Sequence, residues 1–260
     1  MTAPVAALGR GTARQISQVG ALARFFRDTV TSWRTLPRAG RRVARRIFAN
    51  QVWFTAVQAV PLVIVLGSIL SYLVISQAVR ELGRLNATAL IGTLMVVAIV
   101  RELGPLLTAL IVAGRSGTAI ATELATNTVM GEVHALEGMG IDPLHYLVLP
   151  RFLAGIVSVF CLIVLFDNVA IAAGWLAAAA QGMSSARYFD IVLRSLGARD
   201  VWLTVLKGLV FGAIVGTVPS FEGLRVRGGP TGVPVSASRA VVESILAIFL
   251  GSALFVALAT

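Results

Sequence analysis

The stretch FLAGIVSVFCLIVLFDNVAIAAGWLAAAA, residues 152–180, carries one charged side chain, that of Asp167. A helix needs about 20 consecutive apolar residues to cross the hydrocarbon core of a bilayer. Because this stretch exceeds that length and is almost uniformly apolar, it predicts a transmembrane helix. It thereby decides the fold class of the whole chain.

The rest of the 260-residue chain has the same character. Hydrophobic residues make up 57% of it and charged residues 13%, with a mean hydropathy of +0.86, whereas a soluble domain has about 25% charged residues. The predicted spans are residues 52–75, 88–112, 152–180, 201–218 and 240–259. We therefore expect an all-α integral membrane protein with five transmembrane helices. Within the fourth span, Gly208, Gly212 and Gly216 are spaced for close helix packing.

The arginines indicate how the chain lies in the membrane. With a cytoplasmic N-terminus, 15 arginines fall on the cytoplasmic side and five on the other. Positive charge concentrates on the cytoplasmic side of membrane proteins. We therefore expect the N-terminus in the cytoplasm and the C-terminus on the opposite side of the membrane. The net charge of +10 favours anionic lipid headgroups rather than nucleic acid as the partner.

Residues 1–50 form a basic segment ahead of the first span. Apolar residues recur there at helical spacing from Ile16 to Trp33, with arginines between them and Pro37 after them. This pattern is typical of an amphipathic helix that lies in the membrane interface. A basic tail without helical structure is the alternative.

The polar segment 113–151 separates the second and third predicted spans. The apolar residues Val129, Val133, Leu136 and Met139 are placed on one face of a short helix, and Glu132 and Glu137 lie off that face. Such a helix either docks a cytoplasmic partner that drives the spans or packs only against its own protein. The spacing leaves both interpretations open.

Several motifs in this region occur in an order that resembles the MlaE/YrbE permeases, the membrane subunits of MCE-associated ABC transporters. They are Arg101-Glu102-Leu103-Gly104-Pro105, Ala113-Gly114-Arg115, Glu123-Leu124, Ala135-Leu136, Gly140-x-Asp142-Pro143 and Leu149-Pro150-Arg151, followed later by Gly228-Gly229 and Ser238-Arg239-Ala240-Val241-Val242.

The resemblance covers about residues 50–260, and it implies a permease domain at 51–260. It implies a homodimer with a phospholipid cavity, a cytoplasmic ABC ATPase subunit and a periplasmic MCE protein. The residues expected to couple the ATPase are Glu123, Val129, Glu132, Val133, Leu136, Glu137 and Met139.

Charged residues inside the predicted spans are the candidate lipid site. An isolated charge at such depth costs at least about 2.5–3.5 kcal/mol, so it should face a wet cavity or a partner. Arg101 presents a planar guanidinium that suits a phosphate. We expect Arg101, Glu102 and Lys207 to bind lipid, although a structural ion pair and snorkelling of Lys207 to the interface are alternatives. Asp167 is expected to pair with Arg101, to bond Asn168 or to serve in a proton relay.

Other function classes fit less well. The chain has no Gly-x-x-x-x-Gly-Lys-Ser/Thr sequence, so we expect ATP to be bound by a partner and no cofactor or metal to be held here. An intramembrane serine protease would need a histidine on a later span, and none follows His145. An ion-coupled secondary transporter that uses Arg101, Glu102 and Asp167 is the main alternative.

Overall fold

The computed structural model describes residues 20–32, 41–85 and 90–259, and every element in this part of the chain is helical. The elements after residues 20–32 are α2 (Arg41–Thr55), η3 (Val57–Ala59), α3 (Val60–Arg84), α4 (Leu90–Leu94), η4 (Met95–Leu103), α5 (Gly104–Val112), η5 (Ala113–Gly117), α6 (Thr118–Val129), α7 (Glu132–Gly138), η6 (Leu144–Val148), α8 (Leu149–Ala179), α9 (Ser185–Ser195), α10 (Ala198–Leu224), η7 (Gly229–Thr231) and α11 (Gly232–Ala259).

Five helical stretches in the described ranges are long and apolar enough to cross a membrane. They are Ala44–Arg84, Leu90–Val129, Leu144–Ala179, Ala198–Leu224 and Gly229–Leu258. The predicted fold class is therefore confirmed. The first two stretches have 41 and 40 residues, or about 60 Å of helix at 1.5 Å per residue. Each is about twice the thickness of the hydrocarbon core.

The predicted cytoplasmic loop 113–151 was wrong in its extent. Residues 113–129 continue the second span through the π-helical turn η5 into α6, and only residues 130–143 separate α6 from η6, with α7 between them. Within this continuous helix the hydroxyl of Thr118 donates to the carbonyl of Arg115 across 3.0 Å. The polarity of this segment therefore does not indicate a loop, because the chain stays helical up to Val129.

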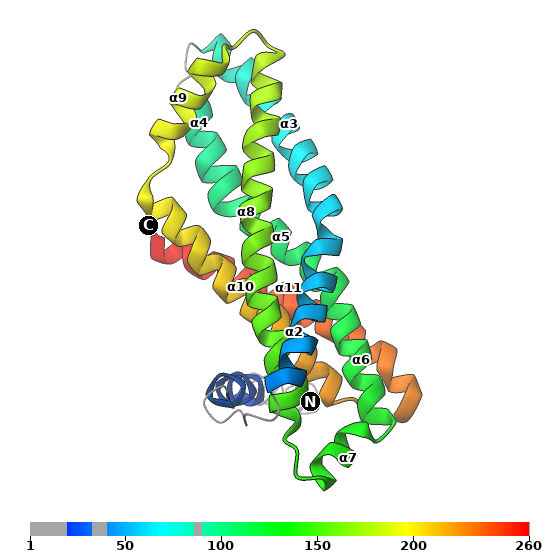
Figure 1. Ribbon diagram of the computed structural model, residues 1–260. Helices are drawn as coiled ribbons and strands as arrows, with labels where there is room; N and C mark the ends of the chain where they lie inside the picture. Colours follow the sequence, from blue (N-terminus) through cyan, green and yellow to red (C-terminus); the bar gives the residue numbers. More distant parts are fainter. Residues whose placement is uncertain (1–19, 33–40, 86–89, 260) are drawn as a thin grey trace, which may run out of the picture.

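The helix α8 forms the centre of the bundle, where it packs along α2, α3 and α10 (Figure 1). Glycines allow the backbones of α8 and α10 to come into direct contact. A Cβ atom on Gly212 would lie 2.5 Å from Cα of Ile156, and one on Gly216 would lie 2.6 Å from Cα of Phe152. The packing role expected of these glycines is thus confirmed, because no larger residue fits this crossing without a shift.

Proline marks two interruptions in the long stretches. Pro61 is the second residue of α3, after a break at residues 56–59, and Pro105 is the second residue of α5, after the π-helix η4. Arg115 spans the first break: its Nη1 donates to the carbonyl of Phe54 across 2.8 Å, and its Nη2 donates to Gln58 Oε1 across 2.5 Å. Proline has no backbone N–H, and it is tolerated at a helix start because an N–H there has no acceptor within the helix.

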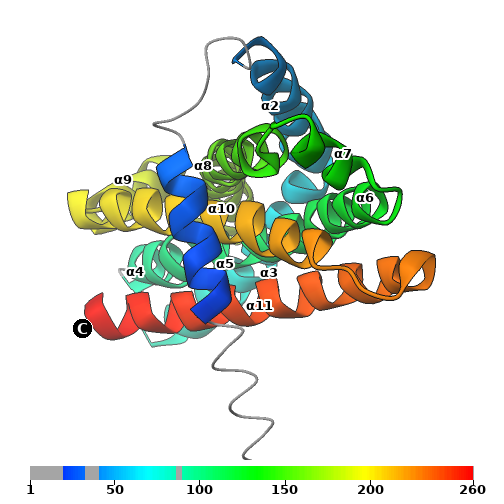
Figure 2. The same cartoon turned by 90° about the horizontal axis from the view of Figure 1, so that it is seen from below.

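A separate helix at residues 20–32 crosses the lower end of the bundle at a steep angle to α8 (Figure 2). The ring of Phe25 packs edge-on against Phe221, with centroids 5.4 Å apart, and Phe26 packs against Phe152 at 5.8 Å. Arg24 and Arg27 on the same helix are exposed. This agrees with the amphipathic pattern, although Ile16, Trp33 and Pro37 lie outside the described residues.

Candidate functional site

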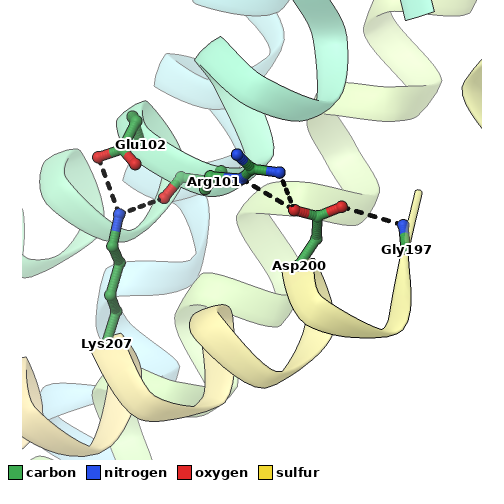
Figure 3. Close-up of polar contacts among 5 residues, drawn as sticks. All are labelled: Arg101, Glu102, Gly197, Asp200 and Lys207. Carbon is green, nitrogen blue, oxygen red and sulfur yellow. Dashed lines mark hydrogen bonds and ion pairs between the residues drawn. The ribbon is translucent and has the colours of Figure 1, made fainter. Parts of the chain in front are cut away.

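Two ion pairs connect η4 with α10 inside the bundle (Figure 3). In the first, Arg101 donates through Nε to Asp200 Oδ1 across 2.8 Å, and its Nη2 contacts the same oxygen. The other oxygen of Asp200 accepts a hydrogen bond from the backbone N–H of Gly197 across 3.0 Å. Asp200 therefore caps the start of α10 and holds Arg101 at the same time.

In the second pair, Lys207 donates to Glu102 Oε2 across 2.8 Å. Its ammonium also donates to the backbone carbonyl of Arg101 across 2.7 Å. Lys207 is 1% exposed, so it does not snorkel to the interface, which was the alternative to lipid binding. Because Asp200 and Lys207 are seven residues apart, about two helical turns, they project from one face of α10.

The four charges balance, and in each pair the residue of α10 is less accessible than the residue of η4. The side chains of Asp200 and Lys207 are 5% and 2% exposed, whereas those of Arg101 and Glu102 are 27% and 30% exposed. One guanidinium nitrogen of Arg101 makes no contact with the other residues drawn in Figure 3. The residues of α10 thus anchor the cluster, and the residues of η4 present its accessible side.

Asp167 does not join this cluster. It was expected to pair with Arg101, but that arginine pairs with Asp200. Asp167 is 8% exposed, and within the described residues its Oδ1 has no hydrogen-bond partner. The amide of Asn168 donates instead to the carbonyl of Val164 across 2.7 Å. Asp167 Oδ1 lies against Gly104, where an added Cβ would be 2.5 Å from it. Its relay role stays a prediction.

A second feature lies at the end of the bundle where α7 joins α6 to η6 (Figure 1). Val133 is buried there and Leu136 is partly buried, against the cluster of Ile120, Leu124 and Leu147. The opposite face of α7 carries exposed residues, namely Glu132, His134, Ala135 and Glu137. This part of the chain therefore packs on its own protein through one face and leaves the other open.

The predicted arrangement of the coupling residues is corrected in two places. Val129 ends α6, because Gly131 breaks the helix with a φ of 80°, and it does not share the α7 face. Met139 caps the end of α7 and is 66% exposed. Glu123 lies on α6 and accepts a hydrogen bond across 2.7 Å from Arg151, which is 4% exposed. This ion pair links α6 directly to α8, the long helices that precede and follow α7 in the chain.

Comparison with known proteins identifies the family. The sequence model described as "Permease MlaE" matches residues 48–258. The chain belongs to the MlaE permease family. It is 32% identical over 207 residues to a probable ABC transporter permease protein of Rickettsia prowazekii, covering 79% of this chain and 80% of that protein.

Two further relatives carry more informative names. The chain is 27% identical over 204 residues to the intermembrane phospholipid transport system permease protein MlaE of Haemophilus influenzae, covering 78% of each. It is 34% identical over 175 residues to Protein TRIGALACTOSYLDIACYLGLYCEROL 1, chloroplastic, of Arabidopsis thaliana. That match covers 67% of this chain but only half the length of the plant protein.

In this permease, the structure adds one residue that the sequence prediction missed. Asp200 was not singled out, although it holds Arg101. The signal was available: Asp200 follows Gly197 by three residues, as expected of a side chain that reaches back to the start of a helix. It also precedes Lys207 by two turns. What the sequence did not indicate is that this face of α10 meets η4.

Proposed function

We propose that the chain is the membrane subunit of an ABC transporter that moves phospholipid between the inner membrane and a periplasmic MCE-domain protein. Two copies form a homodimer, and a separate cytoplasmic subunit binds and hydrolyses ATP. The N-terminus is cytoplasmic and the C-terminus periplasmic. The observation that carries the proposal is the charged cluster between η4 and α10 in a chain of the MlaE permease family.

The cluster has the chemistry to hold a phospholipid headgroup. Arg101 uses Nε and Nη2 for Asp200, and the remaining N–H groups of its guanidinium can donate to a phosphate. Glu102 is accessible beside it and suits the ammonium of an ethanolamine headgroup. Lys207 is buried in this arrangement, so it reaches a headgroup only when its pair with Glu102 opens.

The exposed face of α7 provides the docking surface for the ATPase. Val133 and Leu136 on its packed face lie against Ile120, Leu124 and Leu147, and the Glu123–Arg151 ion pair links the helices on either side. A movement of α7 is therefore transmitted to α6 and α8 through these packed contacts. Both α6 and α8 pack against α10, which carries Asp200 and Lys207. The relative from Rickettsia prowazekii is a probable ABC transporter permease, and the one from Haemophilus influenzae is a phospholipid transport permease; both support this proposal.

The test is native mass spectrometry of the protein purified with its associated chains in mild detergent. We expect two copies of the permease, two ATPase subunits and bound phospholipid. Arg101→Ala should deplete the phospholipid. The matched control is Arg80→Ala, because Arg80 is exposed on α3 and bonds only Gln77 among the contacts described for its side chain.

The outcomes separate the candidate functions. An assembly whose phospholipid survives Arg101→Ala would remove Arg101 from the lipid site while keeping the ABC permease. Proteoliposomes of the permease alone that transport in response to a proton gradient, without ATP or an ATPase subunit, would instead establish a secondary transporter.

A further inference from the structure

Asp167 is an acidic residue that is buried in α8 without a counter-ion. It is 8% exposed, its Oδ1 has no hydrogen-bond partner, and none of the ion pairs between described residues includes it. Its neighbours Ile163, Phe166 and Ala170 belong to the buried apolar core. Because the protein itself removes this carboxyl from water, its burial does not depend on where the bilayer lies along α8. An isolated carboxylate in such surroundings is so unfavourable that the group takes up a proton instead.

Two cations lie where η4 and α10 pack together beside α8, and both are held by other acids. Arg101 pairs with Asp200, and Lys207 pairs with Glu102. The charges of this cluster balance, so it has no positive charge left for Asp167. Breaking either pair to neutralise Asp167 would leave another acid alone inside the bundle, which is costly.

The other elements packed against α8 supply no counter-ion either. The helix α5 has no titratable residue, Tyr72 of α3 is 46% exposed, and the charged residues of α3 lie in its last two turns. Tyr188 of α9 donates its hydroxyl to the carbonyl of Ile171, and Arg199 at the start of α10 is exposed. The basic residues of α2 and η6 lie toward the end of the bundle that holds α7 (Figure 1). Within the described ranges, no cation therefore forms an ion pair with Asp167.

The carboxyl of Asp167 meets the backbone at the junction of η4 and α5. A Cβ atom on Gly104 would lie 2.5 Å from Asp167 Oδ1 and 3.2 Å from the carbonyl oxygen of Ile99. That carbonyl accepts the N–H of Gly104, and its second lone pair can accept another donor. An ionised carboxylate has no donor, whereas a carboxylic acid has one. The two oxygens that border Gly104 are therefore compatible when the carboxyl carries a proton.

We propose that Asp167 is a proton-binding site and is a neutral carboxylic acid in the folded protein at neutral pH, with its O–H directed to the carbonyl of Ile99. Release of this proton would place a negative charge against η4 and make Asp167 compete with Asp200 and Glu102 for their cations. The bound proton therefore preserves the two ion pairs. The site follows from the fold and does not rest on the proposed transport.

The test is infrared spectroscopy of the full chain in detergent at about pH 6, where an aspartate in water is ionised. A protonated carboxyl has a C=O stretch of its own, apart from the bands of carboxylates and of the backbone. We expect such a band in the native protein, and we expect it to shift when the aspartates carry carbon-13 at the carboxyl. This labelling needs no substitution, so it tests the proposal even if a variant fails to fold.

Asp167→Asn should abolish the band that shifts on labelling. The matched control is Asp190→Asn, the same change at an exposed aspartate that pairs with Arg194, and it should retain the band. A native protein without such a band would overturn the proposal, and so would a band that survives Asp167→Asn. A carboxylate at Asp167 with a melting temperature that rises in sodium chloride, but not in choline chloride, would overturn it in favour of a sodium ion.

Stability supplies a second readout. Unfolding exposes Asp167 to water, where it releases its proton, so the folded state binds one proton more and becomes less stable as the pH rises. From about pH 5 to about pH 7, the unfolding equilibrium constant of the native protein should rise about tenfold per pH unit relative to that of Asp167→Asn. Asp190→Asn should follow the native protein. Equal pH profiles for the native protein and Asp167→Asn would contradict a bound proton.

Discussion

The ammonium of Lys207 donates a hydrogen bond to the backbone carbonyl of Arg101 across 2.7 Å. In a regular α-helix, this carbonyl would accept from the N–H of residue 105. That residue is Pro105, which has no N–H to donate. The ammonium of Lys207 is therefore a hydrogen-bond donor to the backbone at the junction of η4 and α5. The same ammonium also binds Glu102.

Removing the ammonium tests this arrangement. Lys207→Met should lower the free energy of unfolding by about 2–4 kcal/mol, because it leaves Glu102 without its cation and the Arg101 carbonyl without this donor. The measurement is thermal or denaturant unfolding in detergent. Adding Glu102→Gln to Lys207→Met should recover part of the loss. A double variant no more stable than Lys207→Met would show that the ion pair is not the source of the effect.

The contact between α8 and α10 predicts a steric effect at Gly212. Gly212→Ala would place a Cβ atom 2.5 Å from Cα of Ile156, so the helices must separate, at a cost of about 1–3 kcal/mol. Gly83→Ala on α3 is the matched control, because no atom lies within 4 Å of its added Cβ. Thermal unfolding should show a lower midpoint for Gly212→Ala only. Equal midpoints would contradict the close packing.

The proposed docking surface on α7 predicts a loss of partner binding without a loss of folding. Ala135 is exposed on this helix, and Ala135→Arg should reduce the ATPase subunit that co-purifies about tenfold through bulk and wrong charge. Ala186→Arg on α9, at the opposite end of the bundle (Figure 1), makes the same change and should have no effect. If both variants retained the ATPase equally, docking would have to occur elsewhere.

Tyr188 on α9, between the third and fourth spans, predicts a pH dependence. Its hydroxyl donates to the carbonyl of Ile171 across 3.2 Å, and burial raises the pKa of Tyr188 from 10.0 to about 12. The folded state thus favours the protonated phenol. Its stabilising contribution is complete below pH 10.0 and is lost as the pH rises to about 12.

The difference in unfolding free energy between the native protein and Tyr188→Phe should therefore shrink across this interval, by about 2 kcal/mol. Unfolding curves at a series of pH values measure it. A difference that stays constant from pH 9 to 12 would contradict the raised pKa.

The candidate site was only partly predictable. Arg101, Glu102 and Lys207 stood out because charge is costly in a bilayer, and each proved to belong to the cluster. Asp167 stood out for the same reason but lies apart from the cluster, against Gly104. Asp200 did not stand out, since it lies near the end of a span, where an acidic residue is common. Which charged residues form ion pairs depends on how the helices pack against one another. The spacing of residues within one helix does not specify this packing.

The sequence by itself determined the five spans, because the need for about 20 apolar residues is a local property of the chain. It also determined the close contact at Gly212, since only small residues permit such an approach. The tertiary structure decided where the spans end and restart, because Arg115 of a distant segment satisfies the backbone at the break before α3. Only the tertiary structure decided that Lys207 and Asp200 lie buried against η4. Their charges are stabilised there by groups of the neighbouring helix instead of by water.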